Sequence, residues 1–247
     1  MQQTSFFDQQ GIAVIRQLGG ASGTVLFDWF DNGYYAAKAY SAQKPYTLIS
    51  EWLCADIASQ LGLPVPARRI IPWKGANWLG FEWRGDPKGY SPGMETKLVN
   101  PECIAGMMAF DVLVCNRDRH GQNMVFQHPS PGSDRYICNL IDHSHSLIGD
   151  FPNFQGLLQF LQNCDDPTAF LQAIPAPLRQ LVQNSTRPFD LWLQKIEALT
   201  RRELEDSSAR LPLEWKPTPD DMVQLMDFLF GRKDKVRALL MAGLSTT

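Results

Sequence analysis

The chain has 247 residues, of which 44% are hydrophobic, so it is long enough to bury a sizeable core as one domain or as two small lobes. Its 23 basic and 26 acidic residues give a net charge of -3 at neutral pH, which argues against nucleic-acid binding driven by bulk charge. No apolar run approaches the roughly 20 residues of a membrane span, and we find no signal-peptide pattern, so we expect no membrane contact.

The cysteines bear on the cellular compartment. There are five of them, they are scattered along the chain, and no two have the C-x-x-C spacing. This usage is typical of reduced thiols, so it predicts a cytoplasmic protein. We expect Cys115 and Cys138 to be buried as small hydrophobic side chains.

Residues 11–40 predict strands that are joined by turns. Asn32-Gly33 between two β-rich runs is a strong hairpin signal. A glycine-rich loop between the first two runs would let backbone amides approach the phosphates of a nucleotide. A plain hairpin turn remains the alternative. The glycines of this loop are Gly19, Gly20 and Gly23.

A lysine and a glutamate in mostly apolar surroundings suggest a buried ion pair. Lys38 interrupts an aromatic and alanine-rich strand, while Pro45 and Gly62 bracket a helix of about four turns. Glu51 lies on a face of this helix that is otherwise fit for packing, and a buried carboxylate needs a cation. We therefore predict a Lys38–Glu51 pair, with a snorkelling lysine and a solvated glutamate as the alternative.

Two further strands are expected at residues 67–73 and 75–85. Residues 85–99 are rich in glycine, proline and charged side chains without a hydrophobic period, which predicts a loop. The next helix is expected to open at Pro101, with Asn100 as its N-cap.

The most informative stretch is residues 110–147. Asp118 is followed five residues later by Asn123, and Asp142 comes nineteen residues after that. Strand-like runs on either side of a proline- and glycine-rich turn predict a hairpin that brings Asn123 close to Asp142. A carboxylate and an amide oxygen are hard-cation ligands suited to magnesium, and Asp118 is then free to accept a proton.

This layout is typical of phosphoryl transfer, in which the protein supplies positioning, magnesium and one carboxylate for the attacking hydroxyl. Asp118-Arg119-His120-x-x-Asn123 with Asp142-His143-Ser144 resembles the catalytic and metal motifs of the HipA-like kinases. The first motif is also similar to that of phosphatidylinositol 3- and 4-kinases. The run Asn116-Arg117 before Asp118 and the segment 51–66 favour the HipA-like family. The H-R-D and D-F-G motifs of ordinary protein kinases are absent.

The resemblance, which spans residues from about 12 to 147, implies a set of roles with ATP and Mg²⁺ as cofactors. Asp118 would orient or deprotonate the acceptor hydroxyl, while Asn123 and Asp142 would hold the metal. Lys38 would contact phosphates, with Glu51 positioning it, and His120 would brace the catalytic loop. The remaining nucleotide-binding residues are Gly20, Ser22 and Gly23 in the flap and Glu82 and Trp83 in a hinge at residues 82–84.

The order of elements predicts an α+β fold. The strands of the first third are followed, after Leu147, by segments with apolar residues at three-to-four spacing, and this segregation favours two lobes. We expect a β-rich N-lobe at residues 1–84 and a helical C-lobe at residues 85–247, with the site in the cleft between them.

The family resemblance also implies a substrate and partners. It points to a serine or threonine protein substrate, in known members often an aminoacyl-tRNA synthetase, and to an antitoxin partner without direct nucleic-acid contact. Family members autophosphorylate a serine in the loop where this chain has Ser22. The sequence has no counterpart of the extra N-terminal subdomain of long HipA proteins, which leaves the toxin role and the partner open.

Four other functions have to be weighed. A lipid or small-molecule kinase would need a basic membrane-facing surface, and the sequence shows no such cluster. A pseudokinase that binds nucleotide as an interaction module would lack a catalytic or metal residue. A metallohydrolase could use His120, Asp142 and two histidines that we expect on the same side of an extended segment, His143 and His145. A Ser144 nucleophile lacks the glycine elbow.

Overall fold

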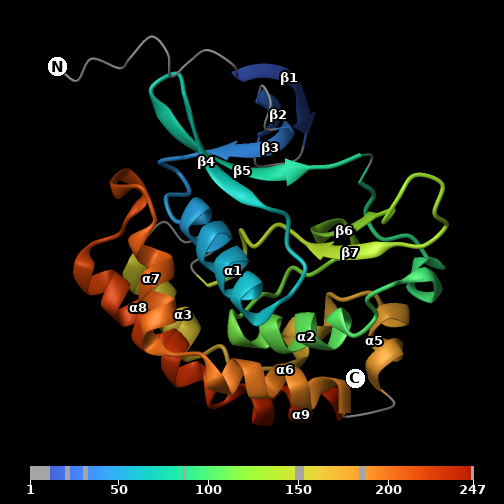
Figure 1. Cartoon of the computed structure of the whole chain (residues 1–247). Coiled ribbons are helices and arrows are strands. Elements are labelled where there is room, and N and C mark those ends of the chain that lie inside the picture. Colours follow the sequence, from blue (N-terminus) through green and yellow to red (C-terminus); the bar gives the residue numbers. More distant parts are fainter. Residues whose placement is uncertain are drawn as a thin grey trace.

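The computed structural model describes residues 12–19, 23–29, 33–85, 87–147, 153–183 and 187–245. These residues form a five-stranded antiparallel sheet, a separate two-stranded sheet and a set of helices. The large sheet lies at one end of the molecule, and α2, α6 and α9 lie at the other (Figure 1). The predicted mixture of an N-terminal β region and a helical remainder is confirmed.

The large sheet has the strand order β1-β2-β3-β5-β4. Hairpins join β2 to β3 and β4 to β5, and in each the glycine near the turn has a positive φ, 88° at Gly33 and 78° at Gly75, which only glycine adopts at no steric cost. Both hairpins agree with the sequence prediction. Gly20 and Ser22 lie outside the described residues. The strands are β1 (Ile12–Gly19), β2 (Thr24–Trp29), β3 (Gly33–Ala39), β4 (Arg68–Trp73) and β5 (Ala76–Trp83).

Helix α1 (Thr47–Leu61) connects β3 to β4 and has the predicted length of four turns. Gly62 ends it in the left-handed conformation, with its N–H bonded back to the last turn. Most of the helix is buried, because its apolar residues pack on several sides. It lies between the large sheet and the helices rather than on the surface (Figure 1).

Helix α2 (Cys103–Leu113) is buried along its whole length and begins later than predicted. The expected N-cap was wrong, since Glu102 occupies that position. The side chain of Asn100 instead accepts from the N–H of Cys138 and donates to its carbonyl, at 3.1 Å in both cases. Asn100 thus fixes the start of this segment to a neighbouring strand.

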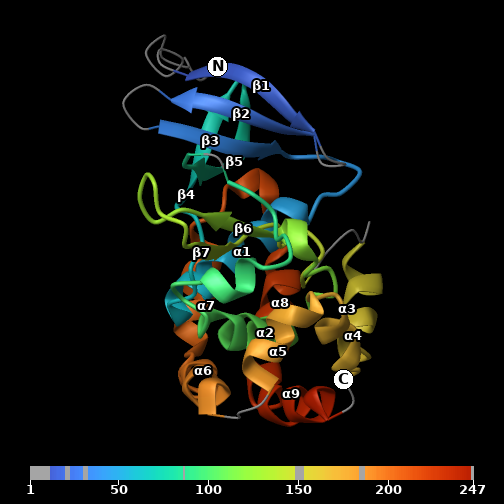
Figure 2. The same ribbon diagram turned by 90° about the vertical axis from the view of Figure 1, so that its right-hand side faces the viewer.

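The strand after Asn123 and its partner form the predicted hairpin. Strands β6 (Met124–Gln127) and β7 (Ile137–Leu140) pair antiparallel, with Met124 opposite Leu140. Lys88 of the preceding loop makes a bridge to Phe126 and so extends this small sheet. The β6–β7 pair lies between the large sheet and α2 in both side views (Figure 2).

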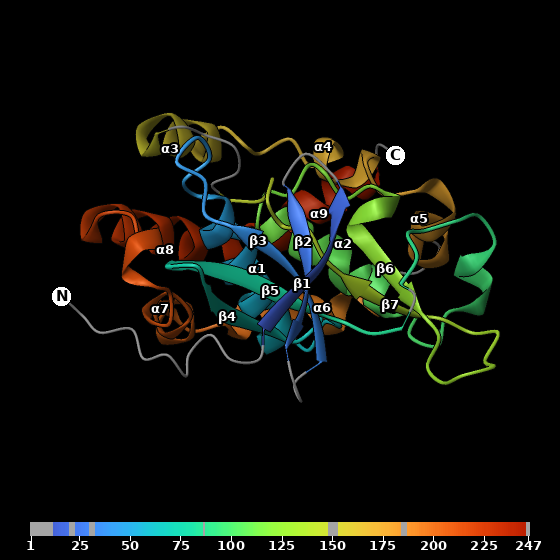
Figure 3. The same ribbon diagram turned by 90° about the horizontal axis from the view of Figure 1, so that it is seen from above.

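The last third of the chain is helical, as predicted. Thr200 caps α7 with a capping box to Glu203 and thereby separates it from α6. Seen from above, α7 and α8 lie to one side of the sheet and α5 to the other (Figure 3). The helices are α3 (Phe154–Gln162), α4 (Thr168–Gln172), α5 (Ala176–Gln183), α6 (Arg187–Ala198), α7 (Arg201–Ala209), α8 (Pro219–Lys233) and α9 (Val236–Leu244).

The core has two parts. The larger one joins α1, α2, the β6–β7 hairpin and the later helices, while a small aromatic cluster around Phe27 and Ile71 covers the other face of the large sheet. All five cysteines are buried and free, so the expectation for Cys115 and Cys138 is confirmed. Within the described part of the chain, no helix is both long and apolar enough to cross a membrane.

Candidate functional site

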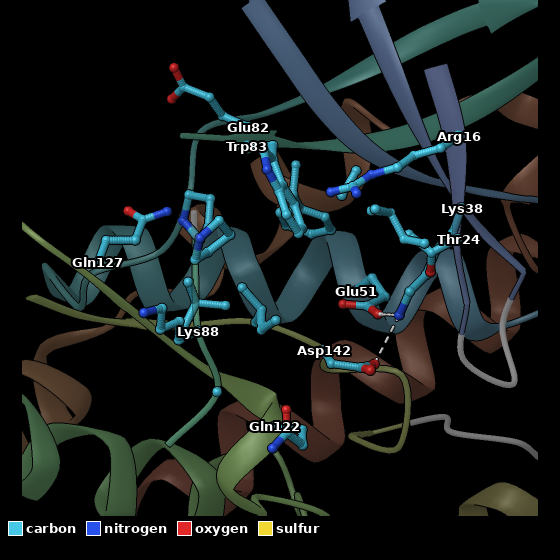
Figure 4. Close-up of a pocket in the computed structure, with 18 of the residues that line it drawn as sticks. Arg16, Thr24, Lys38, Glu51, Glu82, Trp83, Lys88, Gln122, Gln127 and Asp142 are labelled. Carbon is cyan, nitrogen blue, oxygen red and sulfur yellow. Dashed lines mark hydrogen bonds and ion pairs between the residues drawn. The ribbon is translucent and has the colours of Figure 1, made fainter. Parts of the chain in front are cut away.

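A cavity of about 630 Å³ lies between the large sheet and the β6–β7 hairpin. Its volume falls in the range of small-molecule sites. Among the predicted site residues, Lys38, Glu51 and Asp142 line it together with Glu82 and Trp83 (Figure 4). Gly23, Asp118 and Asn123 are not part of its lining.

Lys38 of β3 binds two carboxylates. Its Nζ lies 2.5 Å from Oε1 of Glu51 and 2.9 Å from Oδ1 of Asp142 (Figure 4). The Lys38 side chain is 12% exposed, and that of Glu51 is fully buried. The predicted Lys38–Glu51 pair is therefore confirmed, and the alternative of a snorkelling lysine is wrong.

The ion pairs determine the charge states in this cluster. Burial acts to lower the pKa of Lys38, but Glu51 and Asp142 outweigh it, so the pKa of Lys38 is raised and the ammonium stays charged. Burial likewise acts to raise the pKa of Asp142, but Lys38 and the Ser144 hydroxyl hold that pKa well below its usual range. Asp142 is thus ionised and able to bind a cation.

Glu51 has a fixed place because α1 is attached to the rest of the molecule at several points. Its Oε2 accepts from the backbone N–H of His143 at 2.8 Å, next to Asp142. One and a half turns further along α1, the buried carboxylate of Asp56 accepts from Arg68 of β4, Arg210 and the Ser207 hydroxyl of α7. This network, which the sequence does not reveal, holds α1 to both the sheet and the helices.

Asp118 and Asn123 form a second pair. The Asn123 amide nitrogen donates to Oδ2 of Asp118 at 3.0 Å and to its backbone carbonyl at 2.6 Å. With the nitrogen turned to Asp118, the amide oxygen is the atom left to bind a cation. The Asp118 side chain is 38% exposed, with ring nitrogens of His120 and His145 at 3.7 and 3.9 Å from its Oδ2. Asp118 is therefore an oriented carboxylate that remains accessible.

The segment after β7 is a turn, so the expectation of an extended segment was wrong. Asp142 has a φ of 54°, and the N–H of Ser146 bonds back to the carbonyl of His143 at 3.0 Å. His143 is buried and His145 is exposed, so the two histidines do not face the same side. No group of three or more His, Cys, Asp or Glu side chains suited to a metal occurs among the described residues. The hydroxyl of Ser144 donates to Asp142 at 2.7 Å and serves to hold that carboxylate.

Arg119 braces the loop of residues 118–123, a role that the sequence does not reveal. Its buried guanidinium binds both oxygens of Asp111 and donates to the carbonyls of Asn123 and Ile141, at 2.7 Å each. It thereby ties the start of β6 to the residue before Asp142. His120 is half exposed, accepts from the N–H of Gln122 and lies 3.7 Å from Oδ2 of Asp118, so its expected bracing role stays a prediction.

The predicted hinge residues Glu82 and Trp83 lie at the end of β5. Trp83 pairs with Tyr34 in the sheet, and the N–H of Glu82 donates to the carbonyl of Ala67 at 2.7 Å. The backbone N–H of Glu82 is therefore already hydrogen-bonded within the protein. Hydrogen bonds to a nucleobase would have to come from other backbone groups near it. The Glu82 carboxylate lies 2.8 Å from Nε of Arg84.

Comparisons with known proteins support the fold. No model of a known protein family matches the chain, and no curated protein sequence matches it. The chain is similar to the solved structure of the Helicobacter pylori proinflammatory kinase CtkA, at 16% identity and a TM-score of 0.65, over 95% of this chain and 96% of that one. The HipA structure of Shewanella oneidensis MR-1, from a toxin–antitoxin complex with HipB and operator DNA, aligns at 14% identity and a TM-score of 0.48, over 94% and 67% of the two chains. The likeness to CtkA shows that the chain has the fold of that kinase.

Proposed function

We propose that the chain is a bilobal HipA-like kinase that transfers the γ-phosphate of ATP, with magnesium, to a serine or threonine hydroxyl of a protein. The observation that carries the proposal is the convergence of Lys38, Glu51 and Asp142 on one cavity, with the Asp118–Asn123 pair beside the same hairpin. Residues 1–84 are the N-lobe and residues 85–247 the C-lobe in this proposal.

The donor set fits magnesium, because the ionised Asp142 carboxylate and the Asn123 amide oxygen are hard ligands that leave room for water and phosphate oxygens. When bound, the metal would neutralise charge on the transferring phosphate. Lys38 holds a phosphate oxygen, and Glu51 keeps Lys38 in place. The acceptor oxygen attacks the γ-phosphorus while the bond to the bridging oxygen breaks, ADP leaves, and the acceptor proton passes to Asp118.

The experiment that tests this function is incubation of the protein with labelled ATP, magnesium and cell lysate, followed by identification of the phosphorylated species. Label on a serine or threonine of a protein supports the proposal. Label on a lipid or a small molecule would identify the alternative kinase class. Nucleotide binding without transfer to any acceptor would identify a pseudokinase that acts as an interaction module.

The Lys38–Glu51 pair predicts a coupled loss of activity. Lys38→Met and Glu51→Gln should each reduce phosphotransfer, and the double variant should lose much less than the sum, because the second change removes a contact that is already broken. A coupling of about 0.5–3 kcal/mol in the double-mutant cycle is expected. Full additivity of the two losses in kcat/KM would show that the ion pair does not act as a unit.

Self-phosphorylation of the flap is a further prediction of this function. A phosphate on Ser22 would add about -1.5 to -2 charge near the γ-phosphate position and so repel ATP. Mass spectrometry should find phosphate on Ser22 or Thr24 in the parent and none in the Asp118→Asn variant. An unmodified loop in a parent that phosphorylates another substrate would contradict self-inhibition.

The toxin role belongs to the same proposal. A HipA-like toxin would phosphorylate an aminoacyl-tRNA synthetase and be restrained by an antitoxin. Controlled expression of the parent should then arrest growth, whereas Asp118→Asn should not. Normal growth with an active parent enzyme would separate kinase activity from toxicity.

A further inference from the structure

The charged side chains that line the cavity do not all neutralise one another. Six charged residues contribute to its wall, three basic and three acidic. Lys38 is bound to two carboxylates, so that cluster of one positive and two negative groups has a net charge of -1. The basic residues are Arg16, Lys38 and Lys88, and the acidic residues are Glu51, Glu82 and Asp142.

Two cations remain after this pairing. Glu82 pairs with Arg84, which is not part of the wall. Arg16 and Lys88 form no ion pair with any carboxylate of the described residues. Lys38 and its two carboxylate partners therefore offer no net positive charge to an anionic ligand. Arg16 and Lys88, in contrast, each carry one positive charge that no carboxylate in the described part of the chain compensates.

The sheet register places Arg16 near the Lys38 cluster. Arg16 of β1 is paired with Leu26 of β2, Leu26 with Ala36 of β3, and Ala36 with Phe81 of β5. Residues paired in this way share a face of the sheet, and Lys38 lies two residues beyond Ala36 on that face, about 7 Å further along the strand. Figure 4 shows the Arg16 side chain reaching into the cavity from the sheet.

Lys88 belongs to the opposite wall. Its N–H donates to the carbonyl of Phe126 at 3.2 Å, and its own carbonyl accepts from the N–H of Phe126 at 2.8 Å. These bonds hold the Lys88 backbone against β6, on the side of the cavity away from Arg16 (Figure 4). Two unpaired cations thus approach one cavity from two sides.

We propose that Arg16 and Lys88 bind the polyphosphate of the nucleotide and supply the net positive charge that Lys38 lacks. The inference rests on the proposed function, and it assigns to this site two phosphate-binding residues, one from β1 and one from the loop after β5. Arg16 is suited to binding phosphate, because its planar guanidinium group can donate two hydrogen bonds to one phosphate group.

Calorimetric titration of Arg16→Gln and Lys88→Gln with ATP, ADP and adenosine tests the assignment. A hydrogen bond to a charged group corresponds to roughly a tenfold change in affinity or more. Each variant should therefore bind ATP about tenfold more weakly than the parent does. The loss of affinity should be smaller for ADP, and adenosine should bind to the variants and to the parent equally well. Arg16→Lys should recover part of the ATP affinity. Equal losses for ATP and adenosine, or no loss for either, would overturn the assignment.

Two controls separate this inference from the proposed function. Arg202→Gln removes a cation whose side chain is 89% exposed on α7, and its ATP affinity should match the parent's. Tripolyphosphate tests the anion site without a nucleoside: if the parent binds it and Arg16→Gln weakens that binding tenfold, the inference stands even for a protein that transfers no phosphate. A parent that does not bind tripolyphosphate would overturn the inference, whatever its kinase activity. Thermal melts of all variants establish that they are folded, as expected for the exposed Arg16.

Discussion

The Asp118→Asn variant is expected to bind magnesium ATP like the parent and to lose nearly all phosphoryl transfer. The Asp118 carboxylate does not line the cavity in which we propose that ATP binds, so binding should be spared. Its oxygen is oriented by the Asn123 amide and accessible to an acceptor hydroxyl, a position in which a general base contributes about 10²- to 10⁴-fold in rate. Radiometric phosphotransfer assays give the rate, and calorimetry gives the affinity.

Asp142→Asn should behave differently. Asp142 lies in the cavity wall and carries the charge that a magnesium ion needs, so this variant should lose both metal-dependent ATP affinity and turnover. Asp134→Asn is the matched control, because its carboxylate is 81% exposed in the turn between β6 and β7. If both Asp118→Asn and Asp142→Asn bind and transfer like Asp134→Asn, the assignment of the two carboxylates is wrong.

The parts of the site that the sequence predicts correctly have a local periodic signal. Lys38 stands out because it interrupts an apolar strand, and Glu51 because helical spacing places it on a packing face. The β6–β7 hairpin follows from a turn-rich segment between two β-rich runs. In each case the signal lies within one short stretch of the sequence, so it can be read without tertiary information.

The errors occur where a polar side chain has a distant partner. Asn100 is a residue type that commonly caps helices, but its side chain binds the backbone of Cys138, thirty-eight residues away. Nothing in the local sequence indicates this distant partner. The Asp56 network depends on Ser207 of α7 and on Arg210 just after this helix, and both lie more than 150 residues away. The break before α7 is different, because the sequence does contain its signal. Thr200-x-x-Glu203 is a capping-box pattern, but apolar residues at helical spacing on both sides of it also suggest a continuous helix.

Arg119 is the residue whose loss should destabilise the fold most. Its side chain and that of Asp111 are both fully buried, and the pKa of Arg119 is raised, since Asp111 outweighs the effect of burial. Arg119 is always a donor, so Nδ1 of His143, 3.1 Å from its Nη2, must be the acceptor. Arg119 thus joins α2, the loop of residues 118–123 and the turn after Asp142.

Arg119→Met should lower the free energy of unfolding by about 3–5 kcal/mol, because it leaves the Asp111 carboxylate buried without a counter-charge. Urea denaturation measures this loss, and Arg201→Met, which removes an exposed surface ion pair, should show no comparable change. Asp111→Leu combined with Arg119→Met should recover much of the stability, since no unpaired charge remains in the core. Additive losses of stability in that double variant would mean that Arg119 and Asp111 act separately. The stabilising effect of Arg119 would then come only from its hydrogen bonds to backbone carbonyls.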